Sequence, residues 1–248
     1  MLKENEVKKR ACFLGDSITY GTGVKEGERY FDLLGNELKI ETHGYGESGA
    51  RYIDLIHQAQ KMYDDFGSDV DIVFVFAGTN NFNASMPIGK WFDISQEEVV
   101  AIKNADGSPK VVQKRKKRTF NTDPETFCGG INVVLSFLKH KYADKQIVLM
   151  TPIHRAFATF GNENIQYDEM YSNNIGLFID DYVEKIREAS SVWATEIIDL
   201  YSSGGLFPLF DEGAHYFSNA ETDRLHPGTD GHRRIADVIK SKLNEIDF

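Results

Sequence analysis

Cysteine is scarce in this chain of 248 residues, with only Cys12 and Cys128 present. Two cysteines allow at most one disulfide bond, and these two have no spacing typical of a metal site. Cys12 also lies within an apolar run, so we expect both side chains to be buried as small hydrophobic groups. The sequence therefore argues against a disulfide-rich scaffold and against a cysteine-based metal domain.

Long hydrophobic runs are also missing. No stretch has the length of apolar sequence that is needed to cross a bilayer. The first ten residues, MLKENEVKKR, lack the apolar core of a signal peptide. We therefore expect a cytoplasmic protein, or a secreted one if a signal was removed from this chain.

Positive charge is in short supply. The chain has 28 Lys and Arg against 38 Asp and Glu, which gives a formal net charge of -10. Nucleic acid and anionic membranes repel such a chain on average, so we expect neither as a partner. Small neutral or cationic molecules are easier to accommodate.

The remaining composition is that of an ordinary globular protein, with 41% hydrophobic residues, 27% charged residues and only 6 Pro. The length suits a single domain over residues 1–248 with a large buried core, and it leaves room for an insertion.

Strand-like and helix-like segments alternate along the chain. Four short apolar runs read as parallel strands buried on both faces: 11–15, 71–78, 146–152 and 194–200. Four segments space their apolar residues as helices do: 52–66, 128–142, 177–191 and 231–246. This alternation predicts an α/β fold, a three-layer α/β/α sandwich with a mostly parallel, flavodoxin-like sheet of about five strands.

An excursion at about 83–127 interrupts this alternation and is too long for an ordinary connection. Within it, two β-prone runs flank Asp106-Gly107, which predicts an inserted β-hairpin arm. The basic run 114–118 could bind an anion or nucleic acid, but in an acidic protein we favour a solvated hairpin edge.

Chemically useful residues gather where predicted strands end, which is the edge at which open parallel sheets bind ligands. Four blocks lie there: Gly15-Asp16-Ser17, HGYGESGA at 43–50, GTNN at 78–81 and DRLHPG at 223–228. Each block alone has a structural explanation, since serine caps helices, glycine permits turns and asparagine favours turns. Their joint appearance in this order favours a catalytic site with Ser17 lifted clear of the sheet.

These four blocks resemble those of the SGNH (GDSL-type) hydrolase superfamily. The resemblance implies that Ser17 is the nucleophile and that Asp223 and His226 complete the catalytic set. It also implies an oxyanion hole made of the backbone N–H groups of Ser17 and Gly46 and the side chain of Asn80.

Two positions depart from the family's usual pattern. Gly44 stands where the second block often has Asn, and Asn81 stands where the third often has Asp. Both bear on the hydrogen bonds around the site and on the substrate class rather than on bond breaking.

Elementary chemistry points to the same roles. A serine hydroxyl is a weak nucleophile unless a base removes its proton, so His226 must lie within hydrogen-bond distance of Ser17. Asp223 would orient the imidazole ring, whereas Asp16 is better explained as an acceptor that stabilises the turn. The other histidines considered, His43, His154, His215 and His232, have no spacing typical of a helical zinc motif.

The resemblance implies a serine esterase acting on short-chain acyl esters, and we expect O-acetyl groups on carbohydrate or a similar small soluble substrate. The alternatives are an acyl thioesterase or lysophospholipase and, in another class, a non-catalytic binding or scaffold module that uses the arm. The expected partner is a small-molecule acyl ester, with no cofactor and no metal. The arm is also a candidate element for homo-oligomer formation.

Overall fold

The computed structural model describes residues 8–161 and 164–244. Its centre is a parallel sheet in the order β2-β1-β3-β6-β9, as predicted. The five strands are β1 (Arg10–Gly15), β2 (Glu41–Gly44), β3 (Ile72–Phe76), β6 (Gln146–Met150) and β9 (Glu196–Ile198). This is the flavodoxin-like order, in which the second strand lies at one edge of the sheet.

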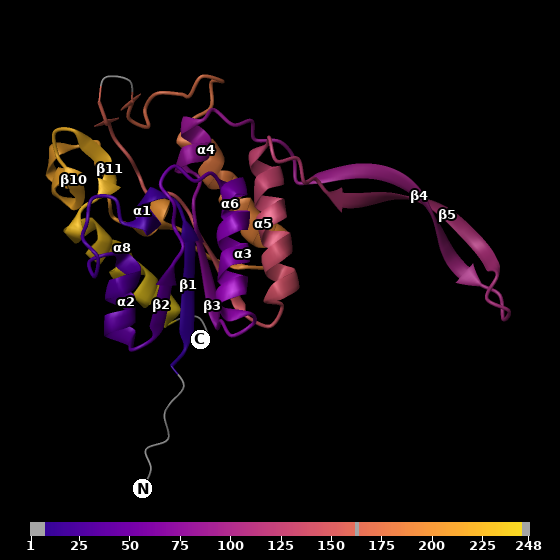
Figure 1. The fold of residues 1–248 in the computed structure, drawn as a ribbon. Helices are drawn as coiled ribbons and strands as arrows, with labels where there is room; N and C mark the ends of the chain where they lie inside the picture. The colour runs from indigo at the N-terminus through magenta and orange to yellow at the C-terminus, as the bar shows by residue number, and fades with distance from the viewer. Residues whose placement is uncertain (1–7, 162–163, 245–248) are drawn as a thin grey trace, which may run out of the picture.

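Helices cover both faces of this sheet (Figure 1), which confirms the three-layer sandwich. One face is covered by α3 (Leu55–Phe66), α5 (Phe127–Lys141) and α6 (Ile179–Trp193). The other face is covered by α2 (Tyr30–Leu38) and α8 (Thr229–Leu243). The sequence pattern had predicted these helices except α2.

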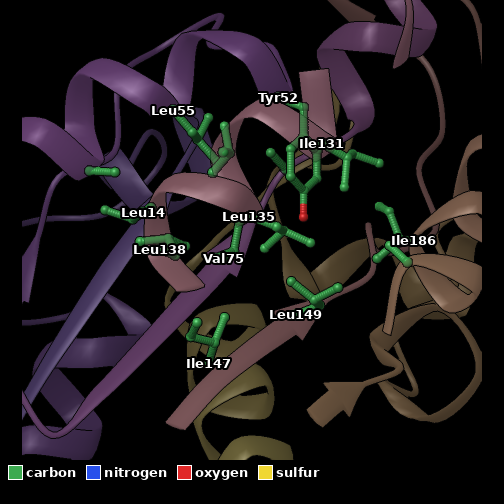
Figure 2. Packing of buried hydrophobic residues seen from close by; sticks show 14 of the residues in the cluster. Leu14, Tyr52, Leu55, Val75, Ile131, Leu135, Leu138, Ile147, Leu149 and Ile186 are labelled. Carbon is green, nitrogen blue, oxygen red and sulfur yellow. The ribbon is translucent and has the colours of Figure 1, made fainter. Parts of the chain in front are cut away.

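Successive residues of each central strand enter opposite cores. In β1, Cys12 and Leu14 pack with the first group of helices, whereas Ala11 and Phe13 pack with α2 and α8. Figure 2 shows the first of these cores, where side chains from the sheet meet those of α3, α5 and α6. Burial on both faces explains why the strands are continuous apolar runs.

The predicted arm is an antiparallel hairpin of β4 (Phe92–Lys103) and β5 (Pro109–Phe120). Gly107 adopts the left-handed backbone conformation in its turn, with φ of 84°. At the root of the arm, the Phe120 ring stacks on Trp193 of α6 with centroids 4.2 Å apart. Beyond this root the hairpin extends away from the rest of the molecule (Figure 1).

A second sheet and several short helices were not predicted. The sheet has the order β10-β11-β7-β8 and consists of β7 (Ala158–Thr159), β8 (Ile165–Gln166), β10 (Phe217–Asn219) and β11 (Asp223–Pro227). The short helices are α1 (Ser17–Tyr20), α4 (Thr79–Asn83), α7 (Leu200–Ser203), and the 3-10 helices η1 (Tyr52–Asp54) and η2 (Asp211–Tyr216).

Two expectations about composition can be compared with the described residues. Both cysteines are free and buried, as expected of small hydrophobic groups. No helix in the described ranges combines the length and apolar character that a membrane span requires.

Candidate active site

Ser17 stands at a tightly constrained turn between β1 and α1. The Gln58 side chain accepts a hydrogen bond from the Gly15 N–H at 2.8 Å and donates one to the Gly15 carbonyl at 2.9 Å. A Cβ atom on Gly15 would lie 2.7 Å from the Phe76 carbonyl oxygen, so only glycine fits there. Ser17 is the first residue of α1, where backbone N–H groups have no partner within the helix.

Asp16 is the N-cap residue of α1. Its Oδ1 accepts a hydrogen bond from the Ile18 N–H at 3.1 Å, as the turn-acceptor interpretation requires. Burial raises the pKa of this carboxyl group to about 6, against the opposing effects of the Ile18 hydrogen bond and of His226. Asp16 therefore supports the turn that presents Ser17.

Asp223 and His226 lie on β11 of the second sheet and approach Ser17 from there. His226 Nε2 lies 3.0 Å from Ser17 Oγ, and His226 Nδ1 lies 2.9 Å from Asp223 Oδ2. All three residues are buried. Residues 209 positions apart in the chain thus meet in one hydrogen-bonded row.

The Asp223 carboxylate has several donors around it. Oδ2 accepts from the Ser218 hydroxyl at 2.7 Å, and Oδ1 accepts from the N–H groups of Leu225 and His226 at 3.1 and 3.0 Å. Burial alone would raise the pKa of Asp223, but the hydrogen bonds from His226 and Ser218 lower it below its ordinary value. The group is therefore ionised near neutral pH.

Ionisation of Asp223 fixes how the protons are arranged. A carboxylate can only accept hydrogen bonds, so His226 Nδ1 carries a proton and donates it toward Asp223. In the neutral ring Nε2 then has a free lone pair, which can accept the hydroxyl proton of Ser17. This is the arrangement in which a histidine can act as the base for a serine.

Asn80 lies at the start of α4 and is connected to the glycine-rich loop. Its Nδ2 donates a hydrogen bond to the Ala50 carbonyl at 3.1 Å. An amide nitrogen carries two hydrogens, so a second donor remains for another acceptor. Asn81, the next residue, is fully buried and its Oδ1 accepts from the Tyr52 N–H at 2.9 Å. Asn81 therefore supports the loop.

Gly46 packs directly against α1. A Cβ atom there would lie 2.5 Å from the Tyr20 nitrogen and 2.7 Å from the Thr19 carbonyl carbon. The lack of a side chain thus brings this loop against the helix that carries Ser17. The function of Gly46 as an oxyanion donor stays a prediction.

The structure adds Gly49 as a second candidate donor, which the sequence reasoning missed. Gly49 has φ of 81° in a turn closed by the Ala50 N–H, which donates to the Glu47 carbonyl at 3.1 Å. A Cβ atom on Gly49 would meet nothing within 4 Å, and the next residue, Ala50, accepts the hydrogen bond from Asn80, which places this turn beside Asn80. The sequence signal was a glycine at the third position of the turn ESGA.

The second sheet also brings Phe160 to the site. Its ring meets the His226 ring edge to face with centroids 5.3 Å apart, although Phe160 remains exposed. A pocket of about 280 Å³ lies between α4 and the segment around β8. Its lining is rich in amide and aromatic side chains: Phe82, Asn83, Asn164, Gln166, Tyr167, Tyr171, Asn173 and Asn174.

The other histidines have separate surroundings. His232 is fully buried, its Nδ1 accepts from the Tyr30 N–H at 3.1 Å, and burial lowers its pKa to about 4. His154 Nδ1 lies 2.5 Å from Glu169 Oε1. Within the described ranges, no three His, Cys, Asp or Glu side chains are grouped as metal ligands.

Comparison with known proteins agrees with this geometry. The profile of the GDSL-like Lipase/Acylhydrolase family matches residues 13–234. The chain therefore belongs to this family, and its fold and family are those of an ester-hydrolysing enzyme. A search of curated proteins gives no match.

Solved structures share the fold at low sequence identity. A protein from Lactobacillus plantarum is 24% identical, with a TM-score of 0.73 over 97% of this chain and 99% of that chain. A possible lipase from Chitinophaga pinensis is 17% identical, with a TM-score of 0.67 over 96% and 98%. The acetyl xylan esterase AlAXEase is 20% identical, with a TM-score of 0.57 over 94% and 99%.

Proposed function

We propose that this protein is a serine esterase that removes short acyl groups, with O-acetyl groups on carbohydrate as its substrate class. The observation that carries the proposal is the hydrogen-bonded row of Ser17, His226 and Asp223. The family membership supports ester hydrolysis in general.

The proposed reaction proceeds through an acyl-enzyme. Ser17 Oγ attacks the ester carbonyl carbon while His226 Nε2 takes its proton, and Asp223 stabilises the imidazolium that forms. When the tetrahedral intermediate collapses, the C–O bond to the alcohol breaks and His226 protonates the departing oxygen. Water, deprotonated by His226, then attacks the acyl-enzyme, releasing the carboxylic acid and restoring Ser17.

The oxygen of the attacked carbonyl becomes negatively charged during both additions and needs donors. The Ser17 N–H and the second N–H of Asn80 are the proposed donors, together with an N–H of the loop that contains Gly46 and Gly49. Loss of one such donor typically costs about two to three orders of magnitude in turnover.

A polar pocket beside α4, the helix that carries Asn80, supports a hydroxyl-rich alcohol in the substrate, although Ser17, Asp223 and His226 do not line it. The pocket beside α4 is lined by amide and tyrosine side chains, which can donate to and accept from hydroxyl groups. An acyl chain of a lipid would instead need a mainly apolar lining. AlAXEase, a structural neighbour, is an acetyl xylan esterase, which adds a weaker argument in the same direction.

The first test is hydrolysis of p-nitrophenyl esters from acetate to octanoate. We expect the rate to fall as the acyl chain lengthens and to be lost in Ser17→Ala, while Ser241→Ala, an exposed serine on α8, keeps full activity. Acetate release from acetylated xylo-oligosaccharides then tests the carbohydrate part. A rate that rises with chain length would favour the thioesterase or lysophospholipase alternative.

A second measurement separates an inactive scaffold from an enzyme with a narrow substrate range. A fluorophosphonate should attach to Ser17 and be located there by mass spectrometry. Absence of both labelling and ester hydrolysis in the folded protein would favour the binding-module alternative.

A further inference from the structure

Among the helices and strands of residues 8–161 and 164–244, the arm is the long element whose side chains have no core to enter. Both strands are twelve residues long, yet most of their side chains are exposed. A two-stranded hairpin is at best marginally stable by itself in water. The exposed apolar residues include Ile94, Val99, Val100, Ile102 and Val112, most of which lie in the half near the turn.

The arm and the rest of the chain carry net charges of opposite sign. Residues 92–120 contain seven Lys and Arg and four Asp and Glu, a net charge of +3 in a chain of net charge -10. The rest of the chain therefore carries -13. The cross-strand register places Lys114, Lys116 and Arg118 opposite Glu98, Gln96 and Ile94, so that one face of the hairpin is mainly basic.

A surface of opposite charge lies at the start of α6. From residue 156 to residue 184 the chain contains no Lys, Arg or His. Asp180, Glu184 and Glu188 are four residues apart and share one exposed side of the helix. Glu184 also pairs with Arg187, and Glu188 with Lys185. Asp180 therefore carries the charge on this side that no ion pair with a described residue offsets. Ile175 and Phe178, just before the helix, are 48% and 43% exposed. This surface, residues 175–184, thus combines negative charge with apolar area, as the arm combines positive charge with apolar area.

The arm root is connected to the same side of α6. The Trp91 indole N–H donates to Glu188 at 2.8 Å, and Phe120 stacks on Trp193. The arm and the 175–184 surface are therefore close to each other on one side of the molecule, but the arm extends away from its own body (Figure 1). A two-fold axis on this side would bring each arm to the other copy's surface in one symmetric contact.

We propose that two copies of this chain form a dimer in which each arm lies on the 175–184 surface of the other copy. The basic strand β5 would face Asp180 and Glu184, and the apolar half of the arm would cover Ile175 and Phe178.

The contact area is bounded by the length of the arm. A strand of twelve residues is about 40 Å long, and a two-stranded face is about 10 Å wide. Two wholly covered arms would bury at most about 1,600 Å² in total, and the 175–184 surface covers only part of each arm, so we expect the contact to fall at the small end of specific interfaces.

The test exchanges charges between the two surfaces. The arm variant is Lys114→Glu with Lys116→Glu, and the surface variant is Asp180→Lys with Glu184→Lys. Sedimentation equilibrium should show wild type at twice the mass of one chain and each variant weakened about tenfold or more in dimer affinity. An equimolar mixture of the two variants should restore the dimer, because each chain then supplies the charge that the other has lost.

Two control variants test whether the loss of the dimer is confined to the arm and the 175–184 surface. Lys25→Glu with Lys61→Glu, and Asp237→Lys, reverse exposed charges elsewhere and should leave the dimer intact. Thermal melting and p-nitrophenyl acetate hydrolysis check that every variant is folded. A wild-type protein that is monomeric at 100 µM would overturn the proposal. A monomeric protein that binds an anionic polymer would overturn it too. So would arm and surface variants that dimerise as wild type does, or a mixture that stays monomeric.

Discussion

Ser17 and His226 share a hydrogen bond but are supported by two different parts of the molecule. Ser17 follows β1, which is buried on both faces and paired with a strand on each side. His226 lies on β11 in a sheet whose other strands are two or three residues long. The serine therefore depends on the main core, while the histidine depends on local hydrogen bonds.

The two halves of the site, the Ser17 turn and the Asp223–His226 segment, are stabilised by different contacts. The Ser17 turn is fixed by the Gln58 side chain, which reaches it from α3. The His226 segment is fixed by Asp223, which accepts from the ring and from the backbone of His226 itself. Substitutions in the first half should change folding stability most, and substitutions in the second should change the orientation of the base, with smaller effects on stability.

Among variants that keep the Ser17 nucleophile, the largest effect should come from Asp223→Asn. An amide nitrogen placed against His226 Nδ1 favours the tautomer with the proton on Nε2, which cannot accept from Ser17. We expect kcat/KM for p-nitrophenyl acetate to fall about 10³- to 10⁴-fold with little change in fold. Unchanged activity would show that His226 does not need this partner.

Asn80→Ala should have the next largest effect on turnover. It removes a donor proposed for the developing oxyanion, at an expected cost of about 10²- to 10³-fold in kcat with KM nearly unchanged. Asn36→Ala, at an exposed asparagine of α2, is the matched control, because Asn83 on α4 lines the pocket proposed for the alcohol. An equal loss in Asn36→Ala would show that the assay does not report the lost donor.

Gly15→Ala tests the core-supported half through stability. The added methyl group would lie 2.7 Å from the Phe76 carbonyl oxygen and 2.8 Å from Thr19 Cβ, so backbone must move. We expect a loss of about 1–3 kcal/mol in the free energy of unfolding, measured by urea denaturation. Gly27→Ala is a useful contrast: its φ is 88°, but its Cβ would meet nothing within 4 Å, so its cost reflects backbone strain alone.

The contrast between the main sheet and the second sheet also explains which elements could be predicted from the sequence. The strands at 71–78 and 146–152 are continuous runs of eight and seven mainly apolar residues, so their burial could be predicted, and the block after the run at 11–15 pointed to Ser17. The hairpin was predicted because Asp106-Gly107 is a strong local turn signal. Both inferences rest on patterns that extend over several residues.

The second sheet could not be predicted for the opposite reason. A strand of two residues, such as Ala158–Thr159, has no periodicity to detect. Its contact with Asp223 joins segments 65 residues apart, so neither that pairing nor the position of Phe160 over His226 was visible in local sequence. Asp223 and His226 were found by their block rather than by the strand that carries them.

The smallest effect should come from Ser218→Ala, which removes one of the hydrogen bonds to Asp223. Because the pKa of Asp223 is lowered in the folded protein, the carboxylate stabilises the fold above its unfolded pKa of about 3.9, and this stability is lost as the pH falls through the lower folded value. Without Ser218 the folded pKa should rise toward the ordinary value. We expect a loss of about 1 kcal/mol at pH 6 that shrinks toward pH 3, measured by urea denaturation at both values. A loss independent of pH would show that Ser218 acts through packing and not through the charge of Asp223.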